Sequence, residues 1–270
     1  MRRGLENPID RELLLREKKE KAREILHDRG INDERIDEAW ALLNENYFLR
    51  HRVKEITWHT EWLTDSDPES AIGLIDVRRR TTGDGIEAVL YTPRQQRTFA
   101  HATAVLDELG MTIIDARIVP LDNDRSFVTL VIMEQDARVE SDETRINKVR
   151  RALTRILTAP SGKVLSVTRG RPRQARMFTT PTTVEFGLTA AGDQTMLELQ
   201  AADRPGLLST IGQVFIEQGI DIEAAKIVTI GEKAEDVFYV CRESGGALDA
   251  AAQQKLGDAL LERLGSGKEE

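Results

Sequence analysis

The residues best suited to bind a small molecule lie where an expected strand passes into a helix, in Gln200-Ala-Ala-Asp203-Arg204-Pro205-Gly206-Leu207-Leu208-Ser209. Gly206 allows close backbone approach, and the N-terminus of the following helix offers unpaired N–H groups to a carboxylate. Asp203 is placed to accept a hydrogen bond from an ammonium group. Asp221 and its neighbour Ile222 begin the next strand and could converge on the same spot. The pattern suits a zwitterionic amino acid, with Asp203, Arg204, Pro205, Gly206, Leu207, Leu208, Asp221 and Ile222 as the candidate site.

Ordinary helix capping explains the same residues and, on local physics alone, explains them better. In that alternative Asp203 is the N-cap residue and Pro205 lies in the first turn of the helix.

Two other short patterns could carry catalytic chemistry. His27-Asp28 lacks further ligands at metal-binding spacing, since the only other histidines are His51, His59 and His101. It is typical of a helix end. Asp122-Asn-Asp124 lies in a polar connection between two expected strands, which is typical of a turn. We therefore predict no catalytic residues, no metal site and no cofactor.

The elements that must position the turn belong to an internal duplication. At an offset of 109 residues, Leu74–Val119 aligns without a gap over Thr183–Val228. Identical residues include Gly110 and Gly219, which stand where a left-handed helix end is expected. At the turn itself the copies differ: the first has Arg94-Gln-Gln-Arg97 and lacks both the acid and the glycine. The sequence therefore places the ligand preferentially on the second copy.

Both copies show the same order of elements. The pattern predicts strands, a helix, two more strands and a final helix in each copy. The expected strands cover 74–77, 87–91, 112–119 and 127–134, then 183–186, 196–200, 221–229 and 236–242, and the last helix of the first copy covers 142–157. Helices must then cover one face of an antiparallel sheet. The predicted class is α+β, with two tandem ferredoxin-like (βαββα-type) units.

A short all-helical segment precedes the two copies. Pro8 and Gly30 bound a first helix, and Asn32 can cap a second one. Sixty residues in a few helices bury too little to be stable alone. We predict a helical segment over 1–63, a first repeat over 72–168, a basic linker over 169–181 and a second repeat over 182–270.

Composition narrows the classes of function. The net charge of −8, with 40% hydrophobic residues, indicates a soluble globular protein and argues against a general nucleic-acid binder. Residues 177–270 hold seven Lys/Arg against sixteen Asp/Glu, so the copy with the candidate turn carries a charge of −9. The sequence offers no apolar run long enough for a membrane span and no secretory signal. We expect a cytoplasmic protein that binds neither nucleic acid nor membrane.

Several of these stretches resemble a known family. Asp203-Arg-Pro-Gly-Leu-Leu, Gly219-Ile-Asp-Ile and Asp236-Val-Phe-Tyr-Val resemble the ACT domain, a small-molecule-sensing module of amino-acid metabolism. The duplication indicates a tandem ACT pair. Upstream, Tyr47-Phe-Leu-Arg-His51 and Glu55-Ile-Thr-Trp-His59 resemble the C-terminal part of the bifunctional [protein-PII] uridylyltransferase/uridylyl-removing enzymes. The resemblance covers nearly the whole chain.

The resemblance implies a glutamine-sensing regulatory region of an enzyme that controls nitrogen assimilation. That family places a nucleotidyltransferase domain and a hydrolase domain, both resembling Mg-dependent enzymes, ahead of its ACT domains. We expect both to be absent here, so residues 1–63 would be a remnant of the hydrolase domain or a linker. The implied partners are an amino acid, most simply glutamine, the PII signalling protein through the parent enzyme, and a second chain through ACT-mediated self-association.

Two alternatives stay open at this point. The chain could be a stand-alone amino-acid-binding tandem ACT protein without a catalytic partner. It could also be an enzyme that uses His27 and Asp28, or the aspartates of the 122–124 turn; an assay of uridylyl transfer or phosphohydrolysis would test this reading.

Overall fold

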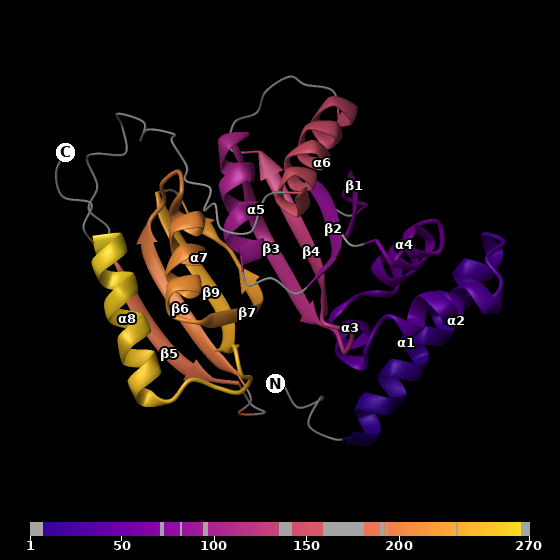
Figure 1. Ribbon diagram of the computed structural model, residues 1–270, viewed down its shortest axis with the longest axis horizontal. Helices are drawn as coiled ribbons and strands as arrows, with labels where there is room; N and C mark the ends of the chain where they lie inside the picture. The colour runs from indigo at the N-terminus through magenta and orange to yellow at the C-terminus, as the bar shows by residue number, and fades with distance from the viewer. Residues whose placement is uncertain are drawn as a thin grey trace. The chain divides into compact units, whose positions relative to one another are not determined.

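The computed structural model describes residues 8–70, 73–81, 83–93, 97–134, 142–158, 181–189, 192, 194–230 and 232–265 (Figure 1). The first helices are α1 (Pro8–Asp28), α2 (Asp33–Ala41), α3 (Glu45–Arg50) and α4 (Val53–Thr64). The first repeat contains β1 (Leu74–Arg79), β2 (Ile86–Pro93), α5 (Arg97–Glu108), β3 (Met111–Pro120), β4 (Arg125–Glu134) and α6 (Asp142–Thr158). The second contains β5 (Thr183–Leu188), β6 (Thr195–Ala202), α7 (Leu207–Glu217), β7 (Ile220–Lys226), β8 (Thr229–Ile230), β9 (Lys233–Arg242) and α8 (Ala250–Gly265). Apart from Pro181, the expected basic linker over 169–181 lies outside the described residues.

The first two helices begin and end where the sequence predicts. Gly30 has a φ of +81°, a conformation that favours glycine and lets the chain turn after α1. The side chain of Asn32 accepts a hydrogen bond from the Arg35 N–H at 3.1 Å and so caps α2. Both helix boundaries are confirmed.

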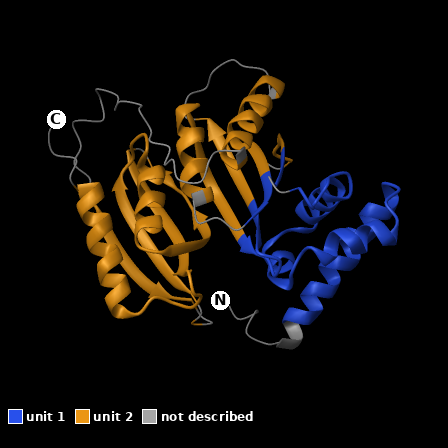
Figure 2. Cartoon of the chain, viewed as in Figure 1, with its two compact units in different colours: residues 1–76, 89–94, 119–128 blue, residues 77–88, 95–118, 129–270 orange. Residues whose placement is uncertain are grey.

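The chain divides into two units, and the first consists of residues 1–76, 89–94 and 119–128 (Figure 2). Its core joins the four helices to apolar strand residues, among them Tyr91 and Phe127. The Tyr47 ring packs edge-on against Phe127 with the ring centres 4.7 Å apart, and its hydroxyl lies 2.7 Å from His59 Nδ1. The helices therefore do not depend on a core of their own, because strand residues complete it.

A half-buried ammonium group also holds this unit together. Lys18 of α1 donates hydrogen bonds from Nζ to the carbonyl oxygens of Phe48, Leu49 and His51, at 2.8–2.9 Å. These carbonyls lie at the C-terminal end of α3, where backbone acceptors lack partners within the helix. The cation of α1 thus fixes the end of α3.

The second unit comprises residues 77–88, 95–118 and 129–270 (Figure 2). The strands form an antiparallel sheet in the order β1-β2-β4-β3-β7-β9-β6-β5, with β8 paired to β9. Helix α6 contacts α5, α5 contacts α7, and α7 contacts α8. These four helices cover one side of the sheet (Figure 1). The predicted α+β class with ferredoxin-like repeats is confirmed.

The register between β3 and β7 shows how the two repeats are joined. The strands run antiparallel, and Ala116 faces Ala225. These alanines are equivalent positions at the 109-residue offset. At the same offset position 115 is equivalent to 224 and position 117 to 226, so exchanging the repeats turns the pair Asp115–Lys226 into the pair Arg117–Ala224. A local two-fold axis therefore passes between the two alanines.

Helices α5 and α7 also pack closely against each other, at Gly212 and Ala100. A methyl group built on Gly212 of α7 would lie 2.7 Å from the Cβ of Ala100 and 2.8 Å from its Cα. Such distances leave no room for any side chain other than hydrogen at position 212. The two repeats therefore share one sheet and one helix layer through close contacts of small residues.

One strand differs from the expectation. The sequence predicts a single strand over 221–229, whereas β7 ends at Lys226 and contains an irregularity between Ile222 and Ala224. The Ile227 N–H donates to the carbonyl of Ile114 in β3 at 3.2 Å. Beyond Val228, the short strand β8 pairs with β9. The break opens a loop that the candidate site uses.

Among the described helices, none combines the length and the apolar character needed to cross a bilayer.

The contact at Gly212 can be tested by substitution. We expect Gly212→Ala to lower the free energy of unfolding by about 1–3 kcal/mol, because the added methyl group forces α5 and α7 apart. Gly257→Ala is the matched control: it adds the same methyl group within α8, where the nearest atom, Phe186 Cε2, is 3.4 Å away. Alanine's helix propensity should make the control neutral or stabilising by up to ~1 kcal/mol. Urea unfolding measures both, and equal stability of the two variants would contradict the close packing.

Candidate functional site

The predicted turn opens onto a cavity whose wall is shared between the two repeats. The lining residues come from α5 and β3 of the first repeat and from the turn, α7 and the β7–β9 region of the second. They are Thr103, Asp107, Met111, Thr112 and Ile113, and then Asp203, Arg204, Gly206, Leu207, Leu208, Ser209, Ile227, Thr229, Ala234 and Asp236. All of them belong to the second unit. The pairing of β3 with β7 and the packing of α5 on α7 bring these residues together.

The geometry of the turn corrects the capping alternative. The N-cap residue of α7 is Gly206, which has a φ of +79° and has no side chain with which to cap the helix. Asp203 lies three residues earlier, and its N–H donates to the Glu232 carbonyl at 2.9 Å. Asp203 is therefore not the N-cap. The N-terminal N–H groups of α7 face a glycine-bearing turn, as binding of a carboxylate requires.

The enclosed part of the cavity is small. It measures about 30 Å³, room for roughly two water molecules at ~10–15 Å³ each. The surrounding depression, counted out to open solvent, has a volume of about 420 Å³. An amino acid must therefore lie mostly in the open depression, or the turn must move to admit it.

Asp236 of β9 is the most unusual group in the cavity. The residue is 1% exposed, and its Oδ1 accepts a long hydrogen bond from the Val228 N–H at 3.4 Å. Oδ2 has no hydrogen-bond partner within the described part of the chain. Burial raises the pKa of Asp236 to about 7, opposed by the Val228 hydrogen bond and reinforced by the negative charge of Asp203. A buried carboxyl oxygen without a partner can accept a hydrogen bond from a ligand.

Two further polar groups, Asp203 and Ser209, line the cavity. Burial raises the pKa of Asp203, while a hydrogen bond from the Arg204 backbone N–H opposes the shift. Ser209, near the start of α7, is buried, and its hydroxyl oxygen has no hydrogen-bond partner among the residues described. The cavity thus presents two carboxyl groups and a hydroxyl to a ligand.

Of the predicted site residues, the structure places Asp203, Arg204, Gly206, Leu207 and Leu208 in the cavity wall, whereas Pro205, Asp221 and Ile222 do not line it. Asp221 and Ile222 lie at the start of β7. Their equivalents in the first repeat, Thr112 and Ile113, line the cavity instead. Because β3 and β7 run antiparallel, the end of β7 lies beside the start of β3, so the turn of the second repeat faces the start of β3 in the first.

The same symmetry implies an equivalent position built from Asp221, Ile222 and the turn of the first repeat. Residues 94–96 of that turn lie outside the described residues. The preference for the second copy stays a prediction.

The sequence pattern did not predict Asp236 as a site residue, although Asp236-Val-Phe-Tyr-Val is one of the stretches that resemble the ACT domain. An acidic residue at the start of an apolar strand was the available signal. Its position opposite the turn depends on the break after β7, which the sequence did not predict.

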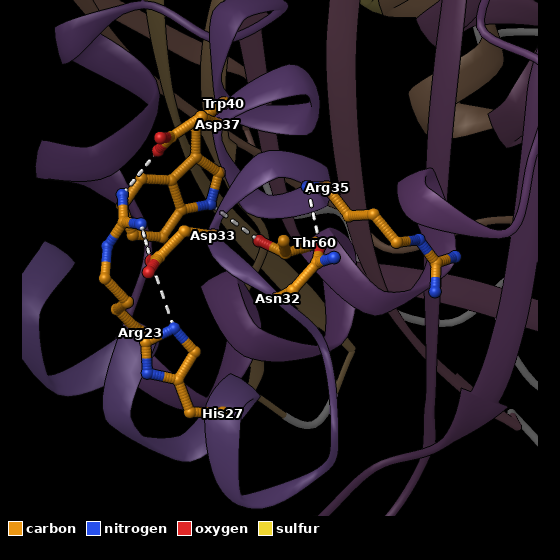
Figure 3. Close-up of polar contacts among 8 residues, drawn as sticks. All are labelled: Arg23, His27, Asn32, Asp33, Arg35, Asp37, Trp40 and Thr60. Carbon is orange, nitrogen blue, oxygen red and sulfur yellow. Dashed lines mark hydrogen bonds and ion pairs between the residues drawn. The ribbon is translucent and has the colours of Figure 1, made fainter.

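The other chemical patterns do not assemble a catalytic centre. His27 Nε2 lies 3.0 Å from Asp33 Oδ1, and Arg23 bonds both Asp33 and Asp37 while its guanidinium stacks over Trp40 (Figure 3). The hydrogen bonds from Arg23 and then His27 hold the pKa of Asp33 below its usual range. This network joins α1 to α2, and its role is structural.

The expected turn at 122–124 is confirmed. The Leu121 N–H donates to the Arg125 carbonyl at 2.8 Å, and Asp124 has a φ of +55°. Within the described ranges, no group of three or more His, Cys, Asp or Glu side chains is arranged to hold a metal ion.

Comparison with known proteins agrees with this arrangement. Residues 10–62 match the family described as "Uridylyltransferase GlnD fifth domain", and residues 195–258 match "ACT domain". Proteins named "Bifunctional uridylyltransferase/uridylyl-removing enzyme" are similar over nearly the whole chain. The chain is similar to the C-terminal region of these enzymes. The resemblance seen in the sequence is confirmed.

Three of these relatives come from pseudomonads. The Pseudomonas fluorescens Pf-5 protein is 32% identical over 268 residues, which are 98% of this chain and 30% of the relative. The Pseudomonas entomophila protein is 31% identical over 272 residues (99% and 30%), and that of Pseudomonas syringae pv. syringae is 32% identical over 273 residues (100% and 30%). The chain thus spans less than a third of the length of these uridylyltransferases.

The raised pKa of Asp236 predicts an unusual dependence of stability on pH. In the unfolded chain this carboxyl titrates near 3.8 and in the folded chain near 7. Between these values the folded state holds the extra proton, so its stability falls as the pH rises through that window. Asp236→Asn removes the titrating group and should raise the free energy of unfolding at pH 8 by about 1–3 kcal/mol.

Urea unfolding between pH 5 and 8 measures this effect. The gain from Asp236→Asn should shrink toward pH 5, where the wild-type carboxyl is protonated. Glu198→Gln, an exposed carboxylate on β6, is the matched control and should show no such trend. A variant no more stable than the wild type at pH 8 would contradict the proposed protonation of Asp236.

Proposed function

We propose that this chain is the glutamine-sensing regulatory region of a uridylyltransferase/uridylyl-removing enzyme that acts on the PII signalling protein. The single observation that carries the proposal is the composite cavity, in which the N-terminus of α7 and the carboxyl groups of Asp203 and Asp236 are enclosed by residues of α5 and β3 from the other repeat. The similarity to the fifth domain and the ACT domain supports the assignment of the chain to such an enzyme.

The chemistry of the cavity matches the two charged ends of an amino acid. The ligand's carboxylate would accept from the N-terminal N–H groups of α7 and from the Ser209 hydroxyl. Its ammonium group would donate to Asp203 and to the open Oδ2 of Asp236. Each ligand end thereby meets a buried group that lacks a partner among the described residues, Ser209 at the carboxylate and Asp236 at the ammonium.

The acidic wall also favours a neutral ligand side chain. Asp107, Asp203 and Asp236 all line the cavity, so the side-chain carboxylate of glutamate would lie beside acidic groups and raise their pKa values further. The amide of glutamine carries no charge and can donate to these oxygens. This difference supports glutamine over glutamate as the ligand.

The small enclosed volume suggests how binding becomes a signal. A glutamine that enters the enclosed part displaces the turn before α7, and α7 packs closely on α5 at Gly212. A shift of one helix would therefore be passed to the other repeat. Regulation then follows if glutamine has different affinities for the two arrangements.

A stand-alone amino-acid-binding role is the second candidate. It is favoured by one observation, namely that both walls of the cavity come from this chain. Under this alternative glutamine still binds, but no catalytic activity changes in response.

The glutamine proposal is tested by thermal unfolding of the 270-residue chain. Millimolar L-glutamine should raise the melting temperature by several degrees, because a ligand that binds only the folded state stabilises it. L-glutamate at the same concentration should raise it less. Asp203→Ala should abolish the glutamine shift.

Glu198→Ala is the control, since it removes an exposed carboxylate of the same sheet outside the cavity and should keep the shift. No stabilisation of the wild-type chain by L-glutamine would overturn the proposal. An undiminished shift in Asp203→Ala would remove the ligand from this site.

A further inference from the structure

A second cavity lies within the first repeat and has a different chemistry. Its volume is about 160 Å³, roughly five times the enclosed part of the candidate site. It lies where β1 ends, β2 begins, β4 ends and β3 begins, beside α6. Apolar cavities of ~150 Å³ in proteins can take up small apolar molecules. The space is therefore large enough for a branched aliphatic side chain.

The inner wall of this cavity is apolar. It is formed by Ile86 of β2, Met111 of β3, Ile132 and Met133 of β4, and Ile146 of α6. The first three are buried, while Met133 and Ile146 are half-buried. Methionine and isoleucine side chains attract hydrocarbon but offer little to a polar side chain. An aliphatic group is the natural occupant.

Charged groups of both signs line the same cavity. Arg79 and Arg145 carry guanidinium groups, and Asp84 and Glu134 carry carboxylates. Arg145 Nε lies 3.1 Å from Glu134 Oε1. The lining is therefore electrically balanced. A balanced pair of cations and anions favours a zwitterion over a ligand with only one charged end.

We propose that the first repeat holds a second binding site, which takes a neutral aliphatic amino acid. Its side chain lies against Met111, Ile132 and Ile146, its carboxylate faces Arg79, and its ammonium faces Asp84. Of the residues that line this cavity, only Met111 also lines the candidate site. The two sites are thus distinct and share one flexible side chain.

The test uses L-leucine as the probe and isothermal titration calorimetry on the full chain. Ile146→Trp fills the cavity and should weaken L-leucine binding at least ~10-fold. Arg151→Trp is the matched control, because it introduces the same side chain at an exposed position of α6 and should leave binding unchanged. Equal affinity in Ile146→Trp and the wild type, or no binding to the wild type, would overturn the proposal.

A second variant avoids the core. Arg79→Gln removes an exposed cation and should weaken L-leucine binding ~10-fold while leaving the binding of 3-methylbutylamine, which lacks a carboxylate, unchanged. An equal affinity of Arg79→Gln and the wild type for L-leucine would contradict the assigned orientation.

Asp203→Ala separates this proposal from the glutamine site. L-leucine binding should persist in Asp203→Ala, and the glutamine response should persist in Ile146→Trp. Loss of L-leucine binding in Asp203→Ala would assign the probe to the candidate site and overturn the second one.

Discussion

The antiparallel pairing of β3 with β7 about Ala116 and Ala225 is the constraint on which the rest of the second unit depends. It places equivalent residues of the two repeats face to face, so the helices above must meet as well. The absence of a side chain at Gly212 lets α7 approach Ala100 of α5. With strands and helices fixed in this way, the start of β3 must lie beside the turn that precedes α7.

The position of the β3 start beside the turn before α7 explains why the candidate site contains residues of both repeats. The turn Asp203–Gly206 provides a carboxyl and a helix N-terminus, while Thr112 and Ile113 provide the facing wall. Asp236 joins them because β7 ends at Lys226 and the N–H of the following Val228 donates to its buried carboxyl. Met111 stands between this site and the cavity of the first repeat, so a ligand in either one contacts the same side chain.

Much of this fold follows from the sequence, because the repeat doubles every local signal. The strands, the helices and the left-handed glycines at 110 and 219 appear twice at one offset, and their class follows from their order. The site was predicted only in part. Local patterns assigned Asp221 and Ile222 to the turn of their own repeat, whereas pairing between repeats brings Thr112 and Ile113 there. Asp236 was missed because its burial depends on a strand break that has no sequence signal.

Amide hydrogen exchange in the presence of L-glutamine tests the composite site most directly. Backbone amides report local opening, and a bound ligand slows exchange wherever it closes the structure. A site shared by the two repeats predicts slower exchange in two segments distant in sequence, Met111–Ile113 and Leu207–Ser209. Slower exchange confined to Leu207–Ser209, or no change in either segment, would contradict a site shared by the two repeats.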